Sequence, residues 1–172
     1  ITAGLQKTAK ELGGQVWHNA DLLEEINYLV EYPTPLYGRI DEEFLDLPVP
    51  AVVTPMRDHQ RYYPVRKEDG SLMPYFLTVR NGGDRAIRNV QIGNERVLRA
   101  RLDDAKFFFD GDRRKSLEGH REALSRINYQ EGMGTMLDKS DRLVKLVEAI
   151  GEDWNFTDTE KADVRRAAYL SK

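Results

Sequence analysis

The chain has 172 residues, 40% of them hydrophobic, so it is long enough to bury a core without stabilising metals or disulfides. It has no cysteine, which excludes a disulfide framework, Cys-ligated zinc, iron–sulfur clusters and thiol nucleophiles. Its 26 Lys and Arg against 29 Asp and Glu give a net charge of -3, unlike the strongly basic domains of free-standing nucleic-acid binders.

Two helices are predicted at the start of the chain. Apolar residues recur at helical spacing in the first, which ends at the pair of glycines at 13 and 14. Asn19 or Asp21 caps the second, which stops before Pro33 and Pro35. The residues that these two helices are expected to bury are Leu5, Ala9, Leu12, Leu22, Leu23, Ile26, Leu29 and Val30.

Short strands are predicted next, interrupted by a short helix at residues 41–47. The Glu-Asp-Gly-Ser sequence at 68–71 has the turn residues of a β-hairpin. We therefore predict an α+β fold in which a small mixed sheet has flanking helices. The expected strands are 36–40, 51–54, 61–66 and 75–80.

From residue 84 onward the chain has no proline, and four helices are predicted. The first is long, covering 84–110, and the second starts near Ser116. The third is expected to begin at Asp138, end at Gly151 and bury Leu143, Leu146, Val147 and Ile150. The fourth begins with a capping box of Thr157 and Glu160. The Asn-Gly-Gly-Asp sequence at 81–84 divides the chain into parts 1–83 and 84–172.

Basic residues concentrate at 85–115, where nine of them stand against five acidic residues. This local excess suits contacts to the phosphates of a nucleic acid, whereas an ordinary solvated helix face is the alternative interpretation. The candidate RNA-binding residues are Arg85, Arg88, Arg96, Arg99, Arg113, Arg114 and Lys115.

Two polar residues, Asn94 and Arg101, fall within the apolar stripe predicted for the long helix. At 100° per residue this stripe contains Ile87, Val90, Val97, Leu98, Ala105 and Phe108. A buried amide or guanidinium without a partner is costly, so each is expected to have one. One interpretation is an internal polar network in which Arg101 pairs with a carboxylate of the first part. The other opens this surface to RNA or to another subunit.

Aromatic and basic residues alternate at 58–65, so His59, Arg61 and Tyr63 are predicted to share one face of a strand. Such a face could stack an unpaired base, but a half-buried sheet surface explains the same pattern.

No catalytic, cofactor-binding or metal-ligating residue is assigned. The three histidines lie on separate predicted elements, and no nucleophile elbow, P-loop or kinase signature occurs. No apolar run approaches the ~20 residues that span a bilayer. The chain begins at Ile1 without a signal-peptide pattern and stops within helix-favouring sequence, so we expect it to be an internal piece of a longer protein.

Six segments, in order and spacing, resemble the β subunit of bacterial two-subunit glycyl-tRNA synthetase. The sequence Asn-Glu-Arg-Val-Leu-Arg-Ala-Arg-Leu within 93–102 is the most specific of them. The segments are 29–33, 41–45, 58–65, 93–102, 104–109 and 134–139.

This resemblance implies a cytoplasmic α2β2 enzyme whose α subunit, using ATP and Mg²⁺, activates glycine while the β subunit binds tRNA(Gly). The fragment itself is then expected to be inactive and to need no cofactor. Residues 1–83 look like a β-chain domain of phenylalanyl-tRNA synthetase, and residues 84–172 like the beginning of a truncated HD-like domain. A purely structural, subunit-bridging scaffold without RNA contact is the alternative role.

Overall fold

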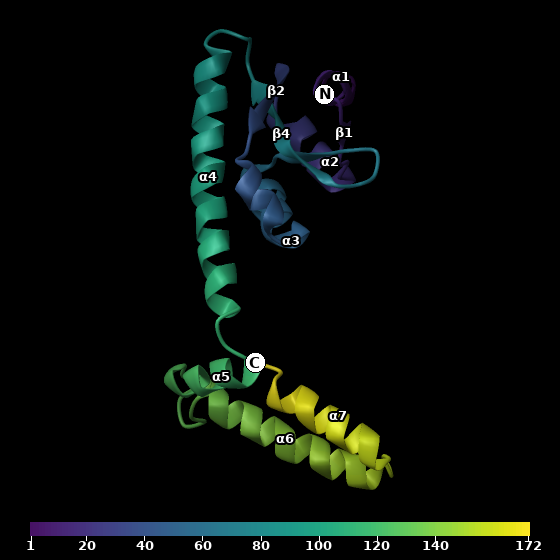
Figure 1. Ribbon diagram of the computed structural model, residues 1–172, viewed down its shortest axis with the longest axis vertical. Coiled ribbons are helices and arrows are strands. Elements are labelled where there is room, and N and C mark those ends of the chain that lie inside the picture. The colour runs from purple at the N-terminus through teal and green to yellow at the C-terminus, as the bar shows by residue number, and fades with distance from the viewer. The chain divides into compact units, whose positions relative to one another are not determined.

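The computed structural model describes residues 1–172, which form two compact units, Ile1–Asp110 and Gly111–Lys172 (Figure 1). The first unit combines one sheet with helices, which confirms the α+β class. Its elements are α1 (Thr2–Glu11), β1 (Gln15–Val16), α2 (Ala20–Leu29), β2 (Pro33–Arg39), η1 (Glu42–Asp46), α3 (Val49–Thr54), η2 (Pro55–His59), β3 (Tyr63–Arg66), β4 (Leu72–Asn81) and α4 (Ile87–Asp112). Those of the second are α5 (Leu117–Arg121), η3 (Glu122–Arg126), α6 (Met136–Asp153) and α7 (Asp158–Tyr169).

The sheet has the strand order β1-β3-β4-β2, and every pair of neighbouring strands is antiparallel, so it is not the mixed sheet expected. β3 and β4 form the predicted hairpin, with Gly70 at a φ of 86° in the turn. β2 lies at an edge, where Pro33 and Pro35 are tolerated because an edge strand needs ladder bonds on one side only.

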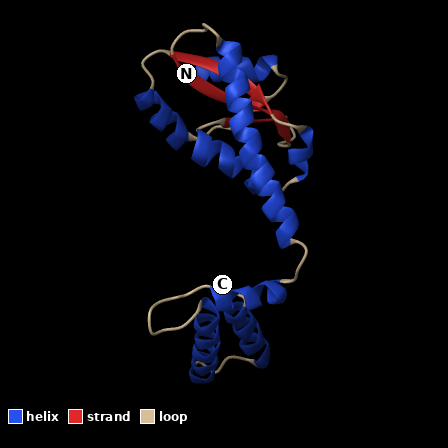
Figure 2. Ribbon diagram, turned by 90° about the vertical axis from the view of Figure 1, so that its left-hand side faces the viewer, coloured by secondary structure: helices blue, strands red, loops and turns tan.

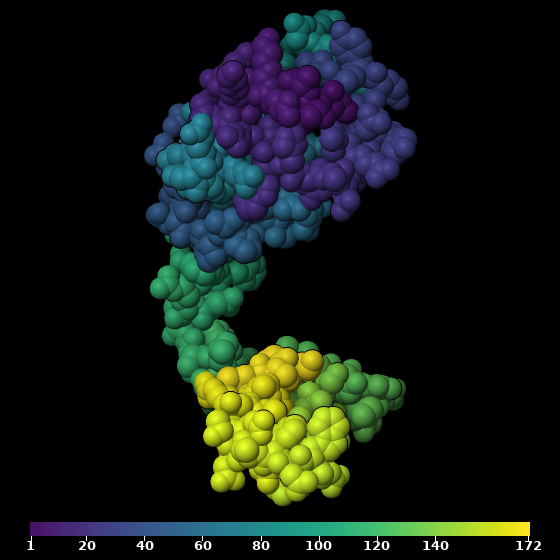
Figure 3. Space-filling model, turned by 90° about the vertical axis from the view of Figure 1, so that its right-hand side faces the viewer, coloured from purple at the N-terminus to yellow at the C-terminus, as the bar shows by residue number.

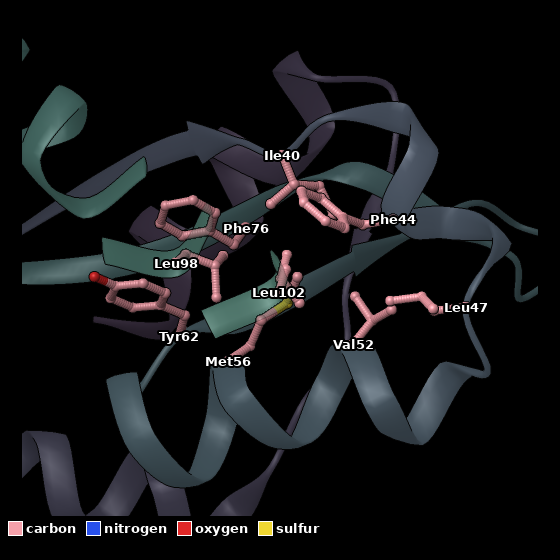
Figure 4. Close-up of a cluster of buried hydrophobic side chains, with 9 residues drawn as sticks. All are labelled: Ile40, Phe44, Leu47, Val52, Met56, Tyr62, Phe76, Leu98 and Leu102. Carbon is pink, nitrogen blue, oxygen red and sulfur yellow. The ribbon is translucent and has the colours of Figure 1, made fainter. Parts of the chain in front are cut away.

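Two apolar cores lie on opposite faces of the sheet, because neighbouring residues of a strand point to opposite sides. On β4, Phe76 belongs to one core and Leu77 to the other. α1 and α2 cover the Leu77 face, and their residues, purple in Figure 3, form much of the surface of this unit in that view. η1, α3, η2 and α4 contribute to the Phe76 face, whose cluster Figure 4 shows.

Tyr62 and Tyr63, adjacent in the chain, also belong to different cores. The Tyr62 ring stacks on Phe76 with centroids 4.5 Å apart. Tyr63 packs in the Leu77 core, and its hydroxyl has no hydrogen-bond partner. Burial raises the pKa of each of the two tyrosines to about 12.

The strand expected at 51–54 is wrong, because these residues belong to helix α3. A short apolar run fits a strand or a buried helix equally well, and the flanking prolines decide the matter. Pro50 lies in the first helical turn, where its fixed φ is favourable and no backbone N–H is needed. The chain continues directly from α3 into the π-helical turn η2.

The face expected to carry His59, Arg61 and Tyr63 is also not formed. His59 lies in η2, and Arg61 has a left-handed φ of 57° that interrupts extended backbone before β3 begins. The Arg61 Nε is 2.6 Å from Glu25 Oε1, and Tyr63 is buried. These three residues therefore offer no shared surface to a base.

The compact units divide between Asp110 and Gly111, in the last turn of α4, so nearly all of this helix belongs with the sheet, whereas the sequence places the boundary at 83 and 84. The cause is burial of Leu98 and Leu102, each 0% exposed, in the core with Phe76. Figure 2 shows α4 crossing beside the strands of this unit.

In the second unit, α6 and α7 pack together. The buried Ser140 hydroxyl donates to the carbonyl of Tyr169 at 3.1 Å, and Arg121 lies over the Tyr169 ring at 3.9 Å. Both long helices begin with capping boxes, Thr157 with Glu160 as expected and Thr135 with Asp138. Asp138 is thus the third helical residue of α6 rather than its cap, and Gly151 lies inside this helix rather than ending it. No helix in the chain combines the length and apolar character needed to cross a membrane.

Candidate nucleic-acid interface

The orientation of α4 determines which of its side chains reach solvent. Leu98 and Leu102, one helical turn apart, face the Phe76 core. Arg96 and Arg99 therefore lie away from the centre of the buried face, and both are exposed. The side chain of Arg99 is 60% exposed.

A cavity of about 360 Å³ opens where the end of β2 and the start of η1 meet α4. Both sequence-predicted residues Arg96 and Arg99 line it. Arg39, which the sequence prediction missed, brings a third guanidinium. The other lining residues are Ile40, Asp41, Phe44 and Glu95.

The charges around this cavity are unevenly paired. Arg99 forms an ion pair with Asp41, and Arg39 Nη2 lies 3.2 Å from Glu42 Oε1. Arg96 is exposed and has no direct hydrogen-bond or ion-pair partner in the structure. We refer below to Arg39, Arg96 and Arg99 as the arginine cluster.

Glu95 fixes the geometry of the cluster. Its Oε1 accepts a hydrogen bond from the Arg39 backbone N–H at 2.9 Å and another from Gln91 Nε2 at 2.9 Å. This carboxylate therefore ties the end of β2 to α4 and satisfies a backbone donor at the sheet edge. Arg88, a further exposed arginine of α4, donates in turn from its Nη1 to Gln91 Oε1 at 2.9 Å.

The remaining predicted basic residues are found elsewhere. Arg85 lies before α4, and its carbonyl accepts a hydrogen bond from Arg80 at 2.7 Å. Arg113, Arg114 and Lys115 are exposed residues of the second unit, in the segment before α5. The structure thus brings only Arg96 and Arg99 of the predicted set to one cavity.

The buried polar network expected for Asn94 and Arg101 is not formed. Arg101 is exposed, Asn94 is only half-buried, and neither has a hydrogen-bond partner. The predicted apolar stripe is rotated from the buried face of α4: its member Leu98 is buried, but Val97 and Phe108 are 46% and 64% exposed. The buried face is centred on Leu98 and Leu102, so Arg101 lies at its margin.

Sequence spacing could not have found Arg39. It precedes Arg96 and Arg99 by more than fifty residues, and only the packing of α4 on the sheet brings them together. The available signal was weak, namely a basic residue at a strand end followed by the acidic residues of η1. The structure gathers no group of three or more His, Asp or Glu that could hold a metal ion.

The whole chain, residues 1–172, matches the protein family described as glycyl-tRNA synthetase beta subunit. Similar proteins are the glycine–tRNA ligase beta subunits of Clostridioides difficile (49% identical, 96% of this chain and 24% of the relative), Halothermothrix orenii (47%, 100% and 25%) and Bacillus subtilis (42%, 100% and 25%). The chain therefore spans about a quarter of the length of these curated relatives.

Proposed function

This chain belongs to the glycyl-tRNA synthetase beta subunit family, and from this premise we propose that it is a tRNA-binding part of a two-subunit glycine–tRNA ligase. In this proposal the chain supports attachment of glycine to tRNA(Gly), while an α subunit carries out the chemistry with ATP and Mg²⁺. The chain itself contributes binding and no catalytic residue. The assembly is an α2β2 enzyme of the cytoplasm.

The observation that carries this proposal is the arginine cluster with its unpaired Arg96, exposed on a chain whose net charge is -3. A guanidinium offers up to five N–H donors in a planar fork that matches the oxygens of a phosphate. Because the overall charge is negative, RNA attraction must be local. Arg85 and Arg88 extend the proposed contact along the start of α4.

A second proposed contact uses Arg113, Arg114 and Lys115 of the other unit. These three consecutive residues are exposed at the connection between α4 and α5, and their cationic side chains suit contacts to RNA phosphates. Each unit thus supplies one basic segment. In keeping with the resemblance, we propose that residues 1–83 correspond to the domain like that of phenylalanyl-tRNA synthetase and that residues 84–172 begin an HD-like domain, whose first helix, α4, packs on the sheet of the first unit.

The alternative role is a subunit-bridging scaffold without RNA contact, and one feature of α4 favours it. Phe107 and Phe108 are 74% and 64% exposed, and Val97 is 46% exposed. The two phenylalanine rings form an edge-to-face pair with centroids 5.6 Å apart. Exposed aromatic residues of this kind are typical of protein interfaces.

The deciding experiment reverses the charge of Arg96 and Arg99 together in the assembled two-subunit enzyme. We expect weaker tRNA(Gly) binding and a smaller salt dependence, with the log–log slope reduced by roughly 0.7 to 0.9 for each phosphate that the variant no longer binds. Glycine-dependent ATP–pyrophosphate exchange should be unchanged, because the proposed role is in tRNA binding.

The matched control reverses Lys7 and Lys10 on α1, which gives the same change in net charge away from the cluster. Equal tRNA affinity of the wild-type enzyme and the Arg96 and Arg99 variant rules out the tRNA contact. The scaffold role then predicts that Phe107→Asp with Phe108→Asp weakens α–β association in analytical ultracentrifugation.

A further inference from the structure

The Asp41 carboxylate can separate from Arg99 without disturbing the local fold. The Asp41 carboxylate is 39% exposed, and although Asp41 is the residue before η1, its side chain makes no capping hydrogen bond there. Only its backbone carbonyl supports η1, by accepting from the Phe44 N–H at 3.2 Å. The carboxylate can therefore turn into water while η1 keeps its hydrogen bonds, and exposed ion pairs of this type are weak because water screens them.

Glu95 holds the backbone beside the cavity in place, whereas the Asp41 side chain has no interaction other than its ion pair with Arg99. Glu95 is fixed by the Arg39 backbone N–H and by Gln91, so it anchors the end of β2 and does not neutralise the Arg39 guanidinium. Arg96 already lacks a partner. Departure of Asp41 thus leaves two unpaired guanidiniums, those of Arg96 and Arg99, at one cavity.

The cavity walls favour a phosphate over a base. Its apolar residues, Ile40 and Phe44, are 5% and 1% exposed, so they offer no ring face on which a base could stack. The polar groups that remain are mainly guanidinium donors, which bind phosphate bidentately. A volume of about 360 Å³ also leaves room for the riboses that flank a phosphodiester.

We propose that Arg39, Arg96 and Arg99 bind one backbone phosphate of RNA, and that this phosphate displaces Asp41 from Arg99 and Glu42 from Arg39. This subsite deepens the proposed tRNA-binding function and rests on it. Asp41 acts as an internal competitor: its carboxylate occupies Arg99 in the free protein and yields to a phosphate that contacts several guanidiniums at once. Arg39 becomes a phosphate-binding residue.

The test measures binding of a short fluorescein-labelled oligouridylate to the 172-residue chain by fluorescence anisotropy. Asp41→Asn removes the competitor and is expected to raise the affinity on the order of 3- to 10-fold. Arg39→Gln keeps the backbone bond to Glu95 and is expected to lower the affinity by a similar factor. Far-UV circular dichroism and thermal melts verify that each variant is folded.

The ion pair of Arg61 with Glu25 supplies a matched control. Its side chains are 52% and 46% exposed, close to the 60% and 39% of Arg99 and Asp41, and it lies outside the cavity. Glu25→Gln therefore releases an arginine and changes the net charge by the same amount as Asp41→Asn. We expect Glu25→Gln to leave oligouridylate affinity close to that of the wild type.

Equal gains from Asp41→Asn and Glu25→Gln would mean a general charge effect and would overturn the subsite, as would unchanged binding by Arg39→Gln. A titration with inorganic phosphate, followed through the arginine Nε–Hε resonances, measures phosphate binding directly. It therefore distinguishes failure of the subsite from failure of the tRNA-binding function. Shifts confined to the three arginines support the subsite even where tRNA(Gly) affinity does not depend on Arg96 and Arg99. If these shifts are absent and Arg39→Gln binds oligouridylate as tightly as the wild type, the subsite is refuted, while the tRNA-binding function is still open to its own test.

Discussion

Gly38 and Gly93 show how the same residue type serves different purposes in one unit. A Cβ atom on Gly38 would lie only 2.1 Å from the Phe76 ring, which rests against the β2 backbone. Gly93 lies in the exposed middle of α4, where a Cβ atom would meet nothing within 4 Å. The first glycine is required by close packing, whereas the second only weakens its helix.

Substitution of these glycines by alanine should therefore change stability in opposite directions. Gly38→Ala overpacks the β2–β4 contact and should lower the free energy of unfolding by about 1 to 3 kcal/mol. Gly93→Ala should raise it by about 0.5 to 1 kcal/mol, because alanine favours helix. Urea denaturation measures both changes, and a destabilising Gly93→Ala would show that this position makes a contact.

At the scale of elements, the two capping boxes define where α6 and α7 begin. The backbone N–H and the hydroxyl of Thr135 both donate hydrogen bonds to the Asp138 carboxylate. These bonds lower the pKa of Asp138, and the backbone bond has the larger effect. Thr157 does the same for Glu160 and lowers the pKa of that carboxyl group. Both boxes therefore depend on ionised carboxylates.

A carboxyl group with a lowered pKa in the folded state stabilises the protein above its unfolded pKa, and this stabilisation disappears as the pH falls through the folded value. The second unit should thus become less stable as the pH falls below about 4, the ordinary range of these carboxyls. Fluorescence of Trp154, at the end of α6, can follow this change. The double variant Asp138→Asn and Glu160→Gln should show a flatter pH dependence, and an unaltered one would contradict the role of the boxes.

At the scale of the whole chain, apolar burial is divided unequally. Both core clusters lie within Ile1–Asp110. In Gly111–Lys172 the buried residues are Ser140, Gly151 and Ala168, all small, while Leu146 and Trp154 are 56% and 71% exposed. Because burial of apolar area is the main source of stability, the second unit is expected to have a smaller free energy of unfolding than the first.

Hydrogen exchange measured by mass spectrometry should reveal this difference. The amides of β3 and β4 are expected to exchange slowest, because these strands carry the buried Tyr63, Val65, Phe76 and Leu77. The amides of α6 and α7 should exchange faster, at a lower free energy of opening. Equal protection of β4 and α6 would show that the two units unfold as one.

The sequence by itself determined the elements whose signals are local. Asn19 caps α2 through a bond from the Leu22 N–H at 2.9 Å, the turn at Gly70 joins β3 to β4, and Thr157 opens α7, all as expected. Caps and turns depend on residues within four positions of one another, so a linear pattern contains them in full. The family resemblance was also readable from the sequence, and the match over residues 1–172 confirms it.

Tertiary structure alone decided which face of α4 is buried and what lies beside it. Val97 and Leu102 are both apolar residues of one helix, and only the position of Phe76 on the sheet buries Leu102 and leaves Val97 exposed. The same packing exposes Arg101, moves the unit boundary to the last turn of α4 and brings Arg39 to Arg96 and Arg99. These outcomes depend on contacts between residues that are distant in the chain. Helical or strand periodicity indicates only which residues share a face, and it does not indicate which face meets the core.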